Sequence, residues 1–135
     1  MIILPDTAVW VSFLRLGLNG PAAGLDRLLA GSAQLVTCGP VVAEILAGAP
    51  DTQRADLWPM LAGLPWVNLR TVDWRTVGDV SARLRQRGET VPLTDVEIAV
   101  AAVFSGAHLW SWDPDFDRVS GVMPELRRTT DSAVS

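Results

Sequence analysis

The stretch Ile2-Ile3-Leu4-Pro5-Asp6 places a short apolar run directly before a carboxylate. Residues 2–4 are predicted to form a buried strand that ends at Pro5-Asp6. The stretch Leu109-Trp110-Ser111-Trp112-Asp113 repeats this arrangement, with a predicted strand over 109–112. Functional sites of open α/β sheets lie beyond the carboxyl ends of the strands. If the two strands are neighbours, Asp6 and Asp113 belong to one site.

Between these two stretches, predicted strands alternate with predicted helices. Further strands are expected at 34–38 and 66–69, and helices at 7–16, 22–30, 39–48, 53–61, 73–86 and 94–105. Apolar strands that alternate with helices favour a parallel sheet covered on both faces. The sequence therefore predicts a three-layer α/β/α fold with a central, mainly parallel sheet of four to five strands. We expect a single domain over residues 1–128 and a flexible tail over 129–135.

The charged residues are unusual, because all eleven basic residues are arginine. The absence of lysine excludes a P-loop and every Schiff-base mechanism. The net charge of −4 has the wrong sign for a generic nucleic-acid binder. However, fifteen acidic residues are present, and several of them around one hard cation would reverse the local charge and attract phosphate.

Cysteine content and hydropathy limit the possible metal sites and the cellular location of the protein. A lone cysteine, Cys38, excludes an internal disulfide and a thiolate zinc site. The longest stretches without a charge, 28–43 and 98–112, are shorter than the roughly 20 apolar residues that a spanning helix needs. We therefore expect a cytoplasmic protein with no membrane partner.

Two more acidic residues are candidates for the same site. Asp95 lies in the first turn of a helix that is apolar almost all round, and Glu44 stands in another apolar helix, where an unpaired carboxylate is costly. Carboxylates that share a pocket repel each other by roughly 3 kcal/mol per ionised pair at about 5 Å and an effective dielectric constant of about 20. Such repulsion raises carboxyl pKa values, and Mg²⁺ or Mn²⁺ removes it.

Each acid taken singly also has a structural interpretation. Asp6 can cap the first helix, Asp113 precedes Pro114 as an N-cap would, and Asp95 complements a helix dipole. Thr94 and Glu97 fit a capping box at the start of the same helix. The spacing of the residues alone leaves these alternatives open.

Four motifs together resemble the PIN-domain family, specifically the VapC toxins, over nearly the whole chain. They are Asp6-Thr7-Ala8-Val9-Trp10, Val42-Ala43-Glu44-Ile45-Leu46, Asp95-Val96-Glu97-Ile98-Ala99-Val100-Ala101 and Ser111-Trp112-Asp113-Pro114-Asp115-Phe116. Ser111 replaces the more usual threonine of the last motif but keeps a hydroxyl group.

This resemblance implies a toxin of a type II toxin–antitoxin system, an endoribonuclease that hydrolyses RNA by Mg²⁺- or Mn²⁺-activated water. It also implies a homodimer, and a heterotetramer or larger assembly with a cognate VapB-type antitoxin. Asp6, Glu44, Asp95 and Asp113 carry over as catalytic and metal-binding residues. Thr7 and Ser111 would support them through hydrogen bonds, and Asp115 is either an outer ligand or, as we favour, a support of its loop.

Other residues are candidates for contact with RNA. They are Arg15, Arg118 and Trp112, with core or dimer packing as the alternative for the tryptophan. Two rival functions remain: another metal-dependent phosphoryl hydrolase, and a catalytically inactive PIN-like binding module. The first lacks support, because Ala8 stands where an aspartyl-phosphate phosphatase usually has a second aspartate.

Overall fold

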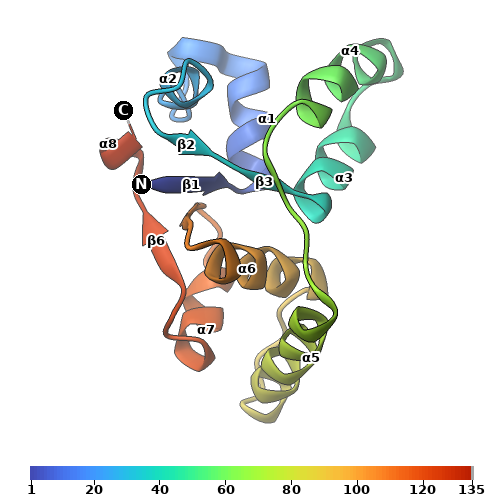
Figure 1. The fold of residues 1–135 in the computed structure, drawn as a ribbon, viewed down its shortest axis with the longest axis vertical. Coiled ribbons are helices and arrows are strands. Elements are labelled where there is room, and N and C mark those ends of the chain that lie inside the picture. The colour runs from blue at the N-terminus through green and yellow to red at the C-terminus, as the bar shows by residue number, and fades with distance from the viewer. Residues whose placement is uncertain (135) are drawn as a thin grey trace.

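A four-stranded parallel sheet forms the centre of the computed structural model, which describes residues 1–134 (Figure 1). Its strands follow the order β2 (Gln34–Leu35), β1 (Ile2–Pro5), β5 (His108–Trp110) and β6 (Arg127–Thr129). A separate parallel pair joins β3 (Thr37–Cys38) to β4 (Trp66–Val67).

The pairing of β1 with β5 confirms that the two stretches singled out in the sequence are neighbours. In this register Leu4 lies opposite Leu109 and Pro5 lies opposite Trp110. The Asp6 amide then donates a hydrogen bond of 2.9 Å to the Trp110 carbonyl. The chain segments that follow both strands therefore leave the sheet at the same edge.

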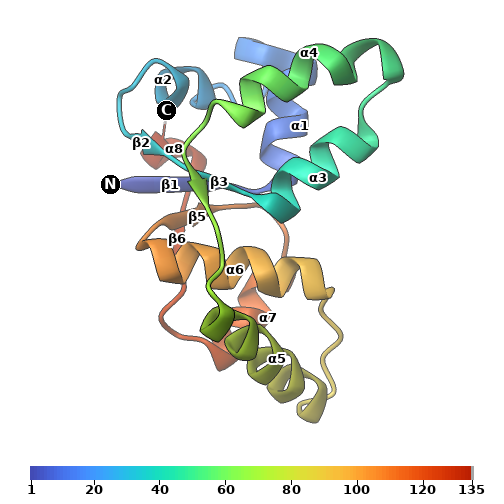
Figure 2. The same cartoon turned by 45° about the vertical axis from the view of Figure 1, so that its right-hand side comes forward.

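Helices cover both faces of the sheet (Figures 1 and 2). One side holds α1 (Thr7–Leu16), η1 (Gly17–Asn19), α2 (Leu25–Leu29), α3 (Gly39–Gly48) and α4 (Asp51–Ala62). The other side holds α5 (Thr71–Gln86), α6 (Leu93–Ser105) and α7 (Asp115–Val122). The predicted three-layer α/β/α arrangement is confirmed.

Helix α6 is buried on most of its circumference, as its apolar sequence predicts. Five successive residues, from Ile98 to Ala102, are at most 3% exposed. The helix therefore anchors Asp95, at its first turn, to the core. The expected capping box is wrong: α6 begins at Leu93 after the extended Pro92, and no side chain caps it. The proline ring fixes the backbone angle φ of Pro92, the residue from which the helix starts. Thr94 is therefore the second residue of the helix and cannot be its N-cap.

The strand expected over 34–38 is divided between the two sheets. The Val36 amide donates to the Ile3 carbonyl, whereas the Thr37 amide donates to the Pro65 carbonyl, each at 2.9 Å. The chain thus changes partner between these residues. The apolar pattern of residues 34–38 indicates only that both parts of the segment are buried. It could not indicate that the segment pairs with two different strands.

The C-terminal segment differs from the flexible tail expected over 129–135. Residue 129 ends strand β6, and Asp131–Val134 form the short helix α8. Val134 is 8% exposed and belongs to the same hydrophobic core as Ile3. Ser135 lies outside the described residues, and the boundary of a single domain at residue 128 stays a prediction. Within residues 1–134, no helix has the length and hydropathy needed to span a bilayer.

Candidate functional site

Three aspartates meet where β5 gives way to α7. One carboxylate oxygen each from Asp95, Asp113 and Asp115 lies within 4.8 Å of the other two, among the residues the structure describes. Asp95 comes from the first turn of α6, Asp113 from the loop after β5, and Asp115 from the start of α7. Oxygen donors at such spacing are those that Mg²⁺ and Mn²⁺ prefer.

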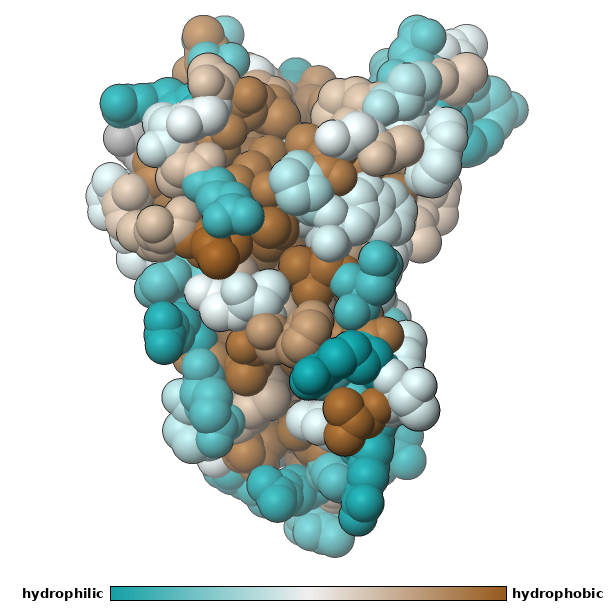
Figure 3. Space-filling view, in the orientation of Figure 1, coloured by the Kyte–Doolittle hydropathy of each residue, from teal (hydrophilic) through white to brown (hydrophobic). Residues whose placement is uncertain are grey.

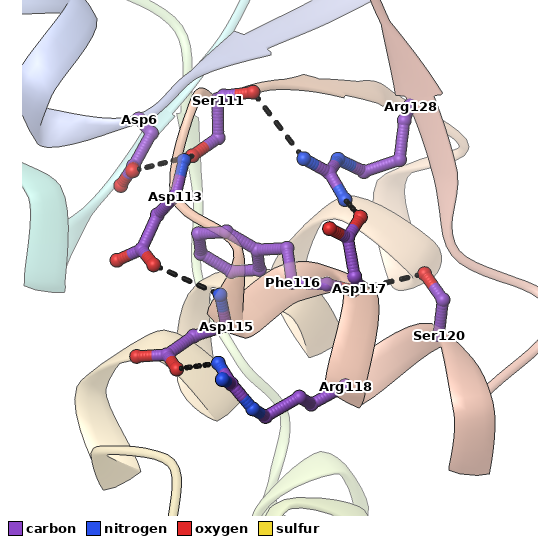
Figure 4. A network of polar contacts seen from close by, with 9 residues as sticks. All are labelled: Asp6, Ser111, Asp113, Asp115, Phe116, Asp117, Arg118, Ser120 and Arg128. Atoms are coloured by element: carbon purple, nitrogen blue, oxygen red, sulfur yellow. Dashed lines mark hydrogen bonds and ion pairs between the residues drawn. The ribbon is translucent and has the colours of Figure 1, made fainter.

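Asp6 is joined to this cluster through Ser111 (Figure 4). The Ser111 hydroxyl donates to Asp6 Oδ2 at 2.8 Å and accepts from the Asp113 amide at 3.1 Å. The other oxygen of Asp6 accepts from the Thr7 amide at 2.8 Å. Asp6 is only 6% exposed, so these bonds fix a buried carboxyl group.

Asp115 is held from both directions by the turn that begins α7. Its amide donates to Asp113 Oδ1 at 2.9 Å, and its carboxylate accepts from Arg118 Nη1 at 2.6 Å (Figure 4). The sequence favoured a supporting role for Asp115 in its loop. The structure shows these contacts within the turn and also brings the Asp115 carboxylate to those of Asp95 and Asp113, as the outer-ligand alternative requires. The Asp-x-Asp spacing of residues 113 and 115 was the signal that could have indicated this.

Glu44 faces solvent rather than the core. Three residues of α3, Val41, Val42 and Ile45, are buried, whereas Glu44 is exposed. The argument that Glu44 is an unpaired carboxylate in apolar surroundings is therefore wrong. Its Oε1 accepts a 2.8 Å hydrogen bond from the Thr7 hydroxyl, which places it beside Asp6.

Crowding of the acids changes their protonation. The pKa of Asp95 is raised to about 7, first by burial and then by repulsion from Asp113, Asp6, Asp115 and Glu44. Burial also raises the pKa of Asp6, against the opposing hydrogen bonds from Ser111 and Thr7. The pKa of Glu97 is raised by burial and by Glu44. Asp95 therefore forms one electrostatic group with Asp113, Asp6, Asp115 and Glu44, and one oxygen each from Asp95, Asp113 and Asp115 converges within 4.8 Å.

The residues considered for RNA contact lie in different places. Arg118 borders the cluster through Asp115, whereas Arg15 is in the last turn of α1, about 13 Å along the helix axis from Asp6. Arg15 lines a groove with Val11, Leu14 and Ile45. Figure 3, in the orientation of Figure 1, shows that apolar residues also reach the surface in the upper half of the molecule, where α1 to α4 lie.

The tryptophans near the site divide into core and surface. Trp10 is 0% exposed and therefore packs in the core, whereas Trp112 is 40% exposed. Trp112 also donates its indole N–H to Asp131 Oδ1 at 2.7 Å, a contact that the sequence did not indicate. Its ring edge is thus fixed while part of its surface stays accessible.

Comparison with known proteins identifies one family. Residues 3–122 match the PIN domain. The chain is 34% identical over 125 residues to a VapC ribonuclease of Mycobacterium bovis and to ribonuclease VapC11 of Mycobacterium tuberculosis. Each alignment covers 90% of this chain and 93% of the relative.

Solved structures share the fold at lower identity. VapBC2 from Rickettsia felis, bound to a DNA fragment from its promoter, aligns with a TM-score of 0.76 and 21% identity, over 96% of this chain and 98% of that one. VapC20 of Mycobacterium tuberculosis, described as a toxin that cleaves the sarcin-ricin loop, aligns with a TM-score of 0.62 and 15% identity, over 85% and 92%.

Proposed function

This chain belongs to the PIN-domain family, and from that premise we propose that it is a VapC-type toxin, an endoribonuclease that hydrolyses RNA phosphodiester bonds. The single observation that carries the proposal is the meeting of Asp95, Asp113 and Asp115 next to Asp6 and Glu44. Curated relatives that are ribonucleases, at 34% identity over most of the chain, support the same activity.

A divalent cation fits the acidic cluster. Every donor is a carboxylate oxygen, and burial together with repulsion from the neighbouring carboxylates raises the pKa of Asp95, although Arg118 pairs with Asp115. We propose that Asp6, Glu44, Asp95 and Asp113, together with Asp115, hold Mg²⁺ or Mn²⁺. Such an ion supplies Lewis-acid activation of water and neutralises charge on a transferring phosphate.

The side chains of the chain itself orient the reacting groups. Ser111 fixes Asp6 relative to the Asp113 backbone, and Thr7 fixes Glu44. Arg118 holds Asp115 and can share its charge with a phosphate at the same edge. The mechanism requires no protein nucleophile: burial raises the pKa of Cys38 to about 11, which keeps it a thiol at neutral pH.

Partners follow from the same assignment. We propose a VapB-type antitoxin as the protein partner, supported by relatives of the same fold solved as VapBC complexes. We also propose a homodimer, a heterotetramer or larger assembly with the antitoxin, and action on RNA in the cytoplasm. Arg118 and the exposed part of Trp112 are the proposed RNA contacts nearest the cluster, whereas Arg15 lies farther along α1.

The test is cleavage of total cellular RNA by the purified protein with Mn²⁺ or Mg²⁺ and with EDTA. Asp6→Asn and Asp95→Asn should each lower cleavage by more than about 100-fold, because even outer-shell partners of metal ligands are worth about 10- to 100-fold. Asp79→Asn, on the exposed face of α5, is the matched control. Cleavage that survives in both site variants would refute the assignment and favour an inactive binding module carrying a contaminant.

A further inference from the structure

The last strand and helix of the chain hold the loop that carries the acids. The Arg128 side chain, on β6, donates from Nη2 to the Ser111 carbonyl at 3.3 Å and from Nη1 to Asp117 Oδ1 at 3.0 Å (Figure 4). Its guanidinium also lies over the Phe116 ring, 5.7 Å from the centroid. Arg128 thus spans the loop from its first residue to the first turn of α7.

Asp131 makes a second connection to the same loop. Both Trp110 and Trp112 donate their indole N–H groups to Asp131 Oδ1, at 2.6 Å and 2.7 Å. These two tryptophans flank Ser111, whose hydroxyl binds Asp6. One carboxylate of α8 therefore fixes the residues on either side of the serine that links Asp6 to Asp113.

The loop needs such external restraints. Residues 111–114 lie between β5 and α7, in neither helix nor strand. Their positions relative to Asp95, on the rigid helix α6, decide whether three carboxylates converge. Metal-ligand geometry depends on outer contacts that restrict the ligands, and contacts from ordered elements restrict them best.

We propose that Arg128 and Asp131 are positioning residues for the acidic cluster, acting through the Ser111 carbonyl and through the indoles of Trp110 and Trp112. The proposal rests on the proposed metal-dependent nuclease function. On this view, residues 127–134 complete the site: they set the affinity for the metal and the turnover rate without touching the metal or the RNA.

Arg128→Gln and Asp131→Asn test the proposal, because both remove charge with little change of size. The matched control is Arg54→Gln. Arg54 similarly joins two backbone carbonyls, Leu46 and Ala49, and one carboxylate, Asp51, but in the connection between α3 and α4. Arg128→Gln removes two charged hydrogen bonds at the loop and Arg54→Gln removes three elsewhere, whereas Asp131→Asn takes the charge from the acceptor of the two indole bonds.

Three readouts separate positioning from stability. Mn²⁺ affinity, measured by calorimetry without RNA, should fall about 10-fold in Arg128→Gln and Asp131→Asn and stay unchanged in Arg54→Gln. The turnover number should fall by a similar factor, with the KM for RNA unchanged. In nitrogen-15 NMR spectra, the six tryptophans give six indole signals, and Asp131→Asn should shift two of them.

The outcomes are distinct. If the two loop variants lose thermal stability like Arg54→Gln but keep wild-type Mn²⁺ affinity and turnover, the positioning role is refuted. If either variant fails to fold, Asp117→Asn, which removes one exposed partner of Arg128, must lower Mn²⁺ affinity or the role of Arg128 is refuted. Failure of the wild type to bind Mn²⁺ or cut RNA would instead refute the proposed function itself.

Discussion

Ser111 Oγ lies 2.8 Å from Asp6 Oδ2, although the two residues are 105 positions apart in the chain. The contact exists because β1 and β5 are adjacent parallel strands that end at the same edge of the sheet. The same hydroxyl accepts from the Asp113 amide. A single serine therefore fixes the position of Asp6, which follows β1, relative to Asp113, which follows β5.

Ser111→Ala should weaken both the fold and the site. A buried hydrogen bond to a charged group contributes about 1.5–3 kcal/mol, so we expect a loss of about 2 kcal/mol in the free energy of unfolding. Ribonuclease activity should fall about 10-fold, as for other outer-shell contacts. Ser111→Thr keeps the hydroxyl and should retain both properties. Urea denaturation and cleavage rates check the pair, and equal losses in the two variants would contradict the role of the hydroxyl.

Much of the fold was predictable because its signals are local. Apolar runs that end at Asp6 and Asp113 identified β1 and β5, and the apolar helix carrying Asp95 was recognisable as buried. Strand β6 was missed, because Arg127-Arg128-Thr129 lacks an apolar pattern. It is held instead by its parallel pairing with β5, in which His108 lies opposite Arg127.

The site was predictable only in part, for a similar reason. Sequence motifs identified the four acids, but burial and direction depend on packing. Glu44 was expected in an apolar environment and is exposed, because its helix turns its other face to the core. Arg128 and Asp131 bear no motif at all. Their contacts form only once β6 lies beside β5 and brings them to the loop.

Asp115→Asn should reduce metal binding, not merely loosen the loop. Its carboxylate lies with those of Asp95 and Asp113, so removing one charge should weaken Mn²⁺ affinity by at least about 10-fold. The control is Asp117→Glu in the same turn, which keeps the charge that Arg128 contacts. Calorimetric titration with Mn²⁺ measures both. Wild-type affinity in Asp115→Asn would return Asp115 to the supporting role that the sequence favoured.

Metal binding should strengthen as pH rises toward neutrality. The pKa of Asp95 is raised to about 7 by burial and by neighbouring carboxylates, so below that pH a proton competes with the cation. We expect the Mn²⁺ affinity to increase between about pH 5.5 and about pH 8, by up to about 10-fold per pH unit below the pKa. Titrations across this range test the prediction, and an affinity independent of pH would contradict it.

Without metal, the same group should make the protein less stable as pH rises. The folded-state pKa of Asp95 is raised above its ordinary value of 3.8 to about 7, so the native state holds a proton that the unfolded chain releases earlier. Its stabilising contribution is therefore complete below about pH 4 and is lost as pH rises through about 7. Asp95→Asn removes the titration, because an amide carries no charge at either end of this range.

In EDTA, Asp95→Asn should consequently melt above the wild type at about pH 8, by about 4 °C for each kcal/mol of desolvation and repulsion relieved, and the difference should shrink toward about pH 4. Asp79→Asn, at an exposed position of α5, is the control and should follow the wild type at every pH. Differential scanning calorimetry at these pH values measures the melting temperatures of the three proteins. Parallel pH dependences of the melting temperature for wild type and Asp95→Asn would mean that neither burial nor the neighbouring acids perturb the ionisation of Asp95.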